Sequence, residues 1–241
     1  IENNFNTTLN LLNIAKKNNS KFIFLSSSRI YSINKSYEFF KLKKKKYFNE
    51  KIYNNGPKTI YGFSKFASEL MIKEYSYAFK INYIINRLGL TSGPWQFGKV
   101  EQGLVSLWLW SHFKKKKLKY IGYGGTGNQI RDVLDIDDLC ELIHIQIKKL
   151  HKINNQTFCI GGGKHSFFKL KDLTKYCQKI TNNNIKINKI KKTSIYDIPY
   201  FITSNSKIFK YYKWKTSHKL NDTLLKTFKW MKNNNKILEK Y

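Results

Sequence analysis

A tyrosine and a lysine stand four residues apart in the pattern Tyr61-x-x-x-Lys65. On a helix, side chains at this spacing share a face, and a lysine ammonium beside a phenol lowers the phenol pKa from about 10 toward neutrality. Such a tyrosine can take a proton from a sugar hydroxyl as a general base. The hydroxyl of Ser27 is a candidate for holding that hydroxyl in place. The alternative is a surface tyrosine beside a solvated lysine.

The segments around these residues alternate between helix and strand patterns. Apolar positions at helical spacing predict helices over residues 2–18 and 59–79, the second capped by Thr59. Short continuous apolar runs predict buried strands over 21–27 and 81–88. This alternation is typical of a parallel α/β sheet. The lysine-rich residues 32–57 between the first strand and the second helix predict a long loop.

The second half of the chain contains shorter elements. Residues 91–95 predict a loop, and Asp137 with Asp138 is the predicted cap of the helix that follows. The remaining patterns predict helices over 100–113, 137–150, 169–180, 206–211 and 220–232, and strands over 118–121, 131–136, 156–160 and 185–190.

The glycine-rich segment Gly122–Gly127 matches G-x-G-x-x-G, the spacing of a dinucleotide-binding turn. That turn must lie between a strand and a helix, with an acidic residue about 20 positions further on. Here the glycines lead into another strand pattern. The segment is therefore interpreted as a turn between two short strands.

The composition favours a globular protein and argues against several other classes. The chain has 241 residues with 41% hydrophobic residues, and no apolar run is long enough to cross a bilayer. The formal charge is +30, but the lysines are spread along the chain, so the runs 43–46 and 114–117 are interpreted as solvated loops or helix ends rather than a nucleic-acid surface. Three widely spaced cysteines indicate neither disulfides nor a metal site, and with no signal peptide they favour the cytoplasm.

Arginine is rare in this chain, although basic residues are common. Of 45 basic residues, only Arg29, Arg87 and Arg131 are arginines. The planar guanidinium makes paired hydrogen bonds that an ammonium cannot copy, so these positions are candidates for geometry-dependent contacts. Arg29 and Arg87 are open to either a structural or a functional interpretation.

The order of these features resembles the extended short-chain dehydrogenase/reductases, the NAD-dependent epimerase/dehydratase family. The resemblance rests on Ser26-Ser27-Ser28-Arg29-Ile30-Tyr31, the Tyr-x-x-x-Lys helix, Arg87-Leu88-Gly89 with Gly93-Pro94, and Arg131–Asp138, which is similar to R-D-x-x-x-V-x-D with isoleucine for valine. It covers essentially the whole chain. Residues 93–96, 99–103 and 120–127 are most similar to the CDP-paratose 2-epimerase branch.

The resemblance implies a role for each matching position. Tyr61 is the catalytic base and acid, Lys65 lowers its pKa and binds the nicotinamide ribose, and Ser27 orients the reacting hydroxyl. Asn3 matches a position near the cofactor, and Arg131 one that contacts the substrate diphosphate. The further substrate-side candidates are Gln96, Gln102 and Asn128.

Two departures from the family pattern refine these expectations. Family dehydratases carry an acidic pair directly after the hydroxyl residue, whereas this chain has Ser28 and Arg29, which favours epimerisation or simple reduction over loss of water. The family's first strand, glycine fingerprint and acidic ribose-binding residue, about 80 to 100 residues, do not precede Ile1. The chain is therefore expected to be an N-terminally truncated fragment that does not hold NAD tightly.

The predicted architecture is α/β, with the C-terminal part of a Rossmann-like doubly wound parallel sheet and a small interleaved α/β substrate domain. Residues 1–90 and 131–165 form the partial NAD-binding domain, and 91–130 and 166–241 form the substrate-binding part. The predicted function of the full-length protein is that of a cytoplasmic, homo-oligomeric NAD-dependent nucleotide-sugar epimerase with a CDP-sugar favoured as substrate. The alternative is a non-catalytic remnant or binding module of that family.

Overall fold

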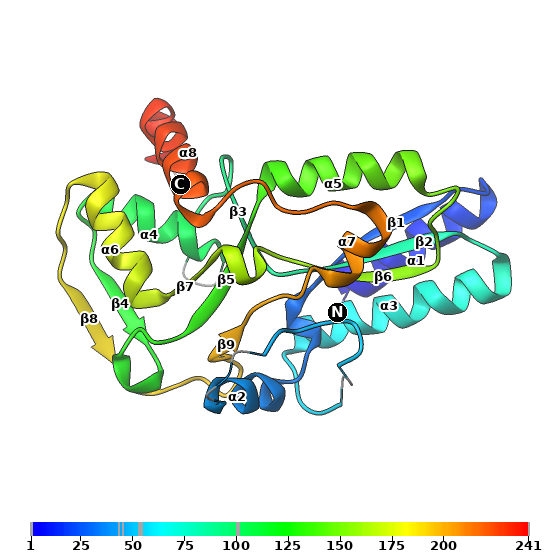
Figure 1. The fold of residues 1–241 in the computed structure, drawn as a ribbon, viewed down its shortest axis with the longest axis horizontal. Coiled ribbons are helices and arrows are strands. Elements are labelled where there is room, and N and C mark those ends of the chain that lie inside the picture. The colour runs from blue at the N-terminus through cyan, green and yellow to red at the C-terminus, as the bar shows by residue number, and fades with distance from the viewer. Residues whose placement is uncertain (1, 43, 45, 53–54, 100–101, 241) are drawn as a thin grey trace.

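A parallel three-stranded sheet forms the centre of the fold (Figure 1). The computed structural model describes residues 2–42, 44, 46–52, 55–99 and 102–240. The sheet has the order β1 (Phe22–Ser27), β2 (Tyr83–Leu88), β6 (Gln156–Ile160), and β1 and β2 pair in register from Phe22 with Tyr83 to Ser27 with Leu88. The carboxyl ends of β1 and β2 therefore lie at the same edge of the sheet.

Helices cover both faces of this sheet. On one face, α1 (Glu2–Lys17) and α3 (Ile60–Phe79) contribute Leu12 and Ile72 to a core cluster that includes Ile85 of β2. On the other face, α5 (Ile136–Lys149) and α7 (Ser206–Tyr212) pack in a cluster that includes Ile84 (Figure 1). Neighbouring side chains of a strand point to opposite faces, so Ile84 packs against one helical layer and Ile85 against the other. The predicted doubly wound α/β class is confirmed.

A second, mixed sheet is built on β5 (Ile130–Asp135). Strands β3 (Leu90–Ser92) and β9 (Tyr200–Phe201) run parallel to β5, and β7 (Phe167–Lys169) runs antiparallel to it. Since β3 follows β2 after one residue, the chain passes directly from the first sheet into the second.

The outer layer combines helices with a two-stranded parallel sheet. Strands β4 (Leu118–Ile121) and β8 (Ile187–Ile190) pair in it, and the helices are α4 (Leu104–Phe113), α6 (Leu170–Thr181), α8 (Leu220–Asn233) and α9 (Asn235–Leu238). The helices share one apolar cluster that includes Leu109, Leu173 and Leu224. The glycine-rich segment connects β4 to β5 through a short 3₁₀ turn, Tyr123–Gly125, so its interpretation as a connection between strands is confirmed.

The predicted loop over residues 32–57 is wrong for its first part, which forms helix α2 (Ile33–Lys41). The side chain of Ser32 accepts a hydrogen bond from the backbone N–H of Lys35, 3.2 Å away, and caps this helix. Ile33 and Phe39 are buried in a cluster with Phe201 of β9. Tertiary packing of these apolar side chains stabilises a helix that a lysine-rich sequence obscured.

Other element boundaries also differ from the prediction. The cap of α5 is Asp135, whose carboxylate accepts from the N–H of Asp137 at 2.9 Å, so the assignment to residues 137 and 138 is wrong. Thr91 and Ser92 belong to β3 rather than to a loop. Helix α4 begins at Leu104, and residues 100 and 101 of the predicted helix lie outside the described residues. The cap at Thr59 is confirmed, with its hydroxyl accepting from the N–H of Gly62.

In the described part of the chain, every helix is too short or too polar to cross a lipid bilayer. The division into a cofactor part, 1–90 with 131–165, and a substrate part, 91–130 with 166–241, stays a prediction.

Candidate active site

Ser27 is the last residue of β1 and the cap of the 3₁₀ turn Ser28–Ile30. Its hydroxyl oxygen accepts a hydrogen bond from the N–H of Arg29, 3.1 Å away. The side chain is partly exposed, so the hydroxyl hydrogen remains able to reach a ligand at this edge of the sheet. The strand end thus presents a hydroxyl group at a fixed position.

The first turn of α3 packs directly on that 3₁₀ turn. A Cβ atom at Gly62 would lie 2.0 Å from the carbonyl oxygen of Arg29, so only glycine permits this approach. Tyr61 precedes Gly62 and is 47% exposed. The backbone at Tyr61 therefore lies beside the turn that follows β1, and the side chain of Tyr61 is accessible to solvent.

Lys65 follows Tyr61 by one helical turn and lies over β1. Its ammonium donates a hydrogen bond to the carbonyl oxygen of Leu25 at 3.0 Å and lies 4.8 Å from the ring centroid of Phe24. Burial lowers the pKa of Lys65 from its ordinary value. Ser27 and the helix that carries Tyr61 and Lys65 therefore meet at the carboxyl end of β1, where open α/β sheets bind ligands.

Asn3 lies at the start of α1, where its side chain is exposed. The neighbouring Asn4 makes the contact with the site: its amide donates to the hydroxyl of Ser64, 3.2 Å away, and that hydroxyl donates to the carbonyl oxygen of Tyr61 at 2.8 Å. Sequence reasoning missed Asn4, and no local pattern marks it because its partner is 60 residues away.

The guanidinium of Arg131 contacts other groups of the protein. It donates to the carbonyl oxygens of Ile130 (2.8 Å) and Ile198 and pairs with Asp197 at 3.4 Å. Burial lowers the pKa of Arg131 to about 10, with Asp197 opposing this shift and the charge of Arg29 adding to it. A diphosphate contact by Arg131 stays a prediction.

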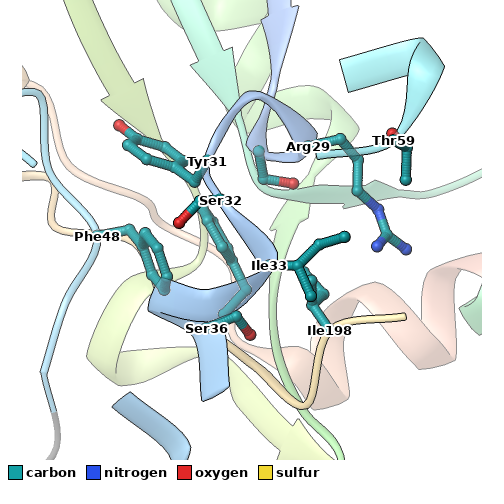
Figure 2. A pocket seen from close by; sticks show the side chains of 10 residues that line it. Arg29, Tyr31, Ser32, Ile33, Ser36, Phe48, Thr59 and Ile198 are labelled. Carbon is teal, nitrogen blue, oxygen red and sulfur yellow. The ribbon is translucent and has the colours of Figure 1, made fainter. Parts of the chain in front are cut away.

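Arg29 lies near Arg131 and lines a small hollow that is open to solvent (Figure 2). Its guanidinium contacts the carbonyl oxygen of Tyr196 at 3.4 Å, one residue before the partner of Arg131. The other lining residues come from α2, β9 and the segments beside Ser27: Ser28, Tyr31, Ser32, Ile33, Ser36, Phe48, Thr59, Ile198 and Phe201. This hollow is a candidate for part of a substrate site.

The weaker substrate-side candidates lie in the connections around α4 and β5. The amide of Gln96 donates to the carbonyl oxygen of Thr91 at 3.0 Å and accepts from Ser106 at 3.3 Å, so it braces its own loop. Gln102 is exposed, and Asn128 is partly buried after the glycine-rich turn. Substrate contacts by Gln96, Gln102 and Asn128 stay predictions.

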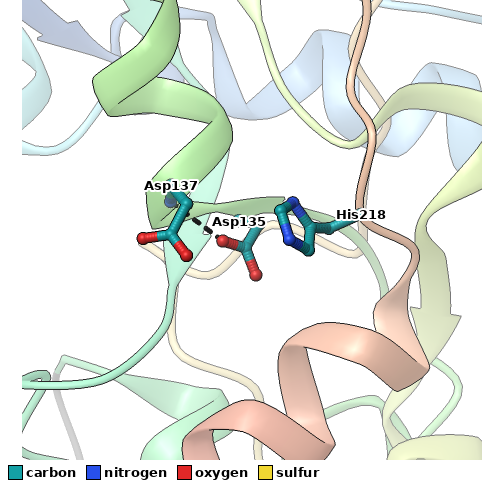
Figure 3. Close-up of side chains that lie close together, drawn as sticks. All are labelled: Asp135, Asp137 and His218. Carbon is teal, nitrogen blue, oxygen red and sulfur yellow. Dashed lines mark hydrogen bonds between the residues drawn. The ribbon is translucent and has the colours of Figure 1, made fainter.

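A group of acidic and histidine side chains lies apart from Ser27, at the start of α5. Asp135, Asp137 and His218 have ligand atoms within 4.8 Å of one another (Figure 3). The ammonium of Lys226 contacts the carboxylates of Asp135 and Asp137, each at 2.5 Å. The carboxylates are thus already compensated by a protein cation.

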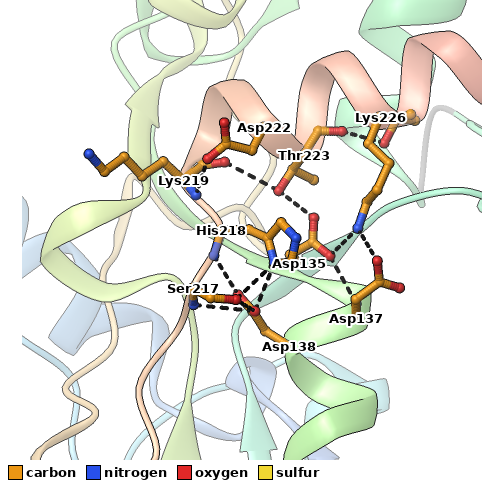
Figure 4. A network of polar contacts seen from close by, with 10 residues as sticks. Asp135, Asp137, Asp138, Ser217, His218, Lys219, Asp222, Thr223 and Lys226 are labelled. Atoms are coloured by element: carbon orange, nitrogen blue, oxygen red, sulfur yellow. Dashed lines mark hydrogen bonds and ion pairs between the residues drawn. The ribbon is translucent and has the colours of Figure 1, made fainter.

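The same group connects α5 to the segment before α8 (Figure 4). Asp135 also accepts from the hydroxyl of Thr223 at 2.7 Å, and Asp138 lies 2.8 Å from Nδ1 of His218. The hydrogen bond to Asp138 raises the pKa of His218. These contacts support a structural role in docking α8.

Comparison with known proteins identifies the family of this chain. The model of the NAD dependent epimerase/dehydratase family matches residues 1–161, and the chain belongs to this family. The predicted family membership is confirmed.

Individual relatives resemble the chain at low identity. CDP-paratose 2-epimerase of Salmonella typhi is 25% identical over 242 residues, which cover 95% of this chain and 70% of the relative. A Methanocaldococcus jannaschii protein whose name proposes a UDP-glucose 4-epimerase is 29% identical over 186 residues, 75% of this chain and 55% of that protein. The crystal structure of UDP-glucose 4-epimerase with UDP-glucose from Thermotoga maritima has a TM-score of 0.82 at 19% identity, over 97% of this chain and 71% of that one.

Proposed function

We propose that this chain carries the catalytic groups of an NAD-dependent nucleotide-sugar epimerase, with a CDP-sugar as the favoured substrate. The observation that carries the proposal is the gathering of Ser27, Tyr61 and Lys65 at the carboxyl end of β1. Family membership and the similarity to CDP-paratose 2-epimerase support the class of reaction and the choice of nucleotide.

Each of the three side chains has a defined task in this proposal. Tyr61 as phenolate takes the proton of a sugar hydroxyl and later returns it. The ammonium of Lys65, one turn further along the helix, favours the phenolate electrostatically. The hydroxyl of Ser27 holds the reacting oxygen, because its own acceptor site is already used by the N–H of Arg29 and its hydrogen is available to donate.

The residues present fit a nicotinamide cofactor at this edge. Lys65 and Tyr61 are the groups that would contact the nicotinamide ribose, and Asn3 lies on the adjacent helix α1. The chemistry that bound NAD supplies is reversible hydride removal from a sugar carbon through a transient keto sugar. The protein's part is orientation and proton transfer.

The residues after Ser27 support epimerisation rather than dehydration. Loss of water requires an acid and a base beside the sugar, and this chain places Ser28 and Arg29 where family dehydratases carry carboxylates. Arg29 instead brings a positive charge to the rim of the hollow.

Two further parts of the proposal concern where the protein acts and with what partner. We propose a homo-oligomer, because α1 and α3 expose apolar side chains, among them Ile14 (55%), Phe63 (54%) and Leu70 (46%). All three cysteines are free, which agrees with a reducing cytoplasm.

The proposal is tested by assaying the full-length protein with NAD against a panel of CDP-, UDP- and dTDP-sugars. Tyr61→Phe is expected to abolish turnover and leave NAD binding nearly unchanged. The matched control is Tyr77→Phe, a change at an 80% exposed tyrosine of the same helix, which should keep full activity. Activity of the Tyr61→Phe variant near that of the parent would contradict the assigned role, and NAD binding without turnover of any sugar would favour a binding module.

A further inference from the structure

A fully buried glutamate lies on the same helix as the candidate acid/base residues. Glu69 follows Lys65 by four residues and Tyr61 by eight, and its side chain has no exposed surface. A carboxylate in such a place needs partners, because an unpaired buried charge is strongly unfavourable.

The partners of Glu69 come from both central strands. The hydroxyl of Ser26 in β1 donates to one carboxylate oxygen at 2.6 Å. Arg87 in β2 donates from Nε to both oxygens, at 3.1 Å each, and from Nη2 to the second oxygen at 2.7 Å. One carboxylate on α3 thereby holds the two strands that end at the site.

The network extends from Arg87 to the segment after Ser27. Nη1 of Arg87 donates to the hydroxyl of Tyr31 at 3.2 Å, and that hydroxyl donates to the carbonyl oxygen of Asn49 and contacts the sulfur of Cys159 in β6 at 2.8 Å. Burial by itself would lower the pKa of Arg87, but Tyr31 and Glu69 raise it above its ordinary value, so the guanidinium stays charged.

A buried ion pair contributes little net stability compared with well-packed apolar side chains. A hydrogen-bonded ion pair instead adds directional contacts. Apolar contacts do not fix the position of a helix along a strand, whereas several hydrogen bonds to one carboxylate do. Ser26 is the neighbour of Ser27, and Glu69 is one turn from Lys65. The network therefore lies where it can set the position of Lys65 relative to Ser27.

We infer that Glu69 and Arg87, acting through Ser26, are positioning residues that set the register of α3 on β1 and hence the approach of Tyr61 and Lys65 to Ser27. This inference rests on the proposed function. None of the three residues is exposed enough to contact a substrate, with exposed fractions of 0%, 6% and 4% for Glu69, Arg87 and Ser26.

The decisive variant is Ser26→Ala in the full-length protein. It removes one hydrogen bond to a charged group, worth about 1.5–3 kcal/mol, and leaves the bonds of Arg87 to Glu69, so the fold is expected to survive. Ser68→Ala is the matched control, because Ser68 is a fully buried serine of α3 whose hydroxyl donates to the carbonyl oxygen of Ser64 within the helix. Each variant removes one buried serine hydroxyl, but Ser26→Ala breaks a contact between α3 and β1 and Ser68→Ala breaks one within α3.

The readouts are kcat, KM and the pH profile of kcat of the full-length protein with NAD and a nucleotide sugar. Ser26→Ala is expected to lower kcat about tenfold or more with little change in KM, and to shift the acidic limb of the kcat–pH profile. Ser68→Ala should change none of these.

Two contrary results separate the inference from the function it rests on. If Tyr61→Phe is inactive and Ser26→Ala behaves like Ser68→Ala, the positioning role is wrong while the proposed function stands. If Tyr61→Phe stays active, the proposed function fails and the positioning role with it. Glu69→Gln is the second variant: it keeps the shape of the carboxylate but removes its charge, and it should lower kcat more strongly than Ser26→Ala does.

Discussion

The ammonium of Lys65 donates a hydrogen bond to the carbonyl oxygen of Leu25, 3.0 Å away, two residues before the strand ends at Ser27. This contact links the candidate acid/base helix to the strand that supplies the candidate serine. It also explains how a lysine can be drawn into a half-buried place beside Phe24 without an acidic partner, since a carbonyl oxygen and an aromatic ring both attract the cation.

Replacing Lys65 by methionine should remove the charge that favours the Tyr61 phenolate. We expect kcat at neutral pH to fall about 10²- to 10⁴-fold, the range attributed to general acid–base catalysis. Because the lost ammonium is the group proposed to favour the phenolate, activity should partly recover as the pH is raised. Lys73→Met, a change on the same helix two turns further along, is the control, and a loss of the same size in both variants would contradict the role of Lys65.

Replacing Gly62 by alanine should disturb the site without touching a candidate catalytic group. The added Cβ would lie 2.0 Å from the carbonyl oxygen of Arg29, so the first turn of α3 must move away from the turn after Ser27. We expect a loss of about 1–3 kcal/mol in the free energy of unfolding, together with a lower kcat. Ile195→Ala, at a 77% exposed position outside α1 and α3, should change stability by about 0.5 kcal/mol or less; urea unfolding of both variants measures the difference.

Asp132 should make the stability of the protein depend on pH between about 4 and 6. Burial raises the pKa of its carboxyl to about 6, against hydrogen bonds from the N–H groups of Gly163 (2.9 Å) and Thr203 (3.0 Å) that lower it. A carboxyl with a raised pKa contributes stability below its unfolded pKa, and that contribution is lost as the pH rises through the folded value. The loss is at most about 3 kcal/mol at 1.36 kcal/mol per pKa unit.

Asp132→Asn tests this dependence. Both N–H groups donate to the same oxygen, Oδ2, so an amide can keep both hydrogen bonds while removing the charge. The variant should therefore gain stability relative to wild type between pH 5 and pH 7.5 in urea unfolding. Asp172→Asn, at a partly buried position in the first turn of α6, is the control. An unchanged difference between variant and wild type at the two pH values would show that Asp132 does not titrate in this range.

The apolar face of α1 and α3 should mediate self-association. Leu70→Lys places a charge on a residue that is 46% exposed, so it should leave the monomer folded and shift the protein toward monomer in light scattering after gel filtration. Leu225→Lys, at a similarly exposed leucine of α8 (48%), is the matched control and should keep the assembly state. A wild-type protein that is monomeric at all concentrations would contradict the proposed homo-oligomer.

Much of the central architecture followed from local patterns. The apolar runs before Ser27 and before Leu88 are too short for helices and predicted the buried strands β1 and β2. Thr59 and the apolar spacing after it predicted helix α3 with its correct start. These features can be predicted from short stretches of sequence because a strand or a helix places successive side chains at a fixed spacing.

Helix α2 and the cap of α5 did not follow from the sequence. The apolar side chains of α2 are stabilised by packing against β9, which is more than 150 residues away, while the local composition is that of a solvated loop. Asp135, Asp137 and Asp138 stand close together, and the sequence alone does not say which of them caps α5.

The sequence by itself determined which chemistry is available: a Tyr-x-x-x-Lys helix, a serine at a strand end, and no carboxylate after that serine. Only the tertiary structure decided how these groups are held. Glu69 and Arg87 are 18 residues apart and no sequence pattern pairs them, yet they meet in the interior because α3 packs on β1 and β2. A buried charge is tolerated only where a partner of opposite charge lies close to it in the folded protein. The packing of distant segments meets that condition, and their spacing in the sequence does not.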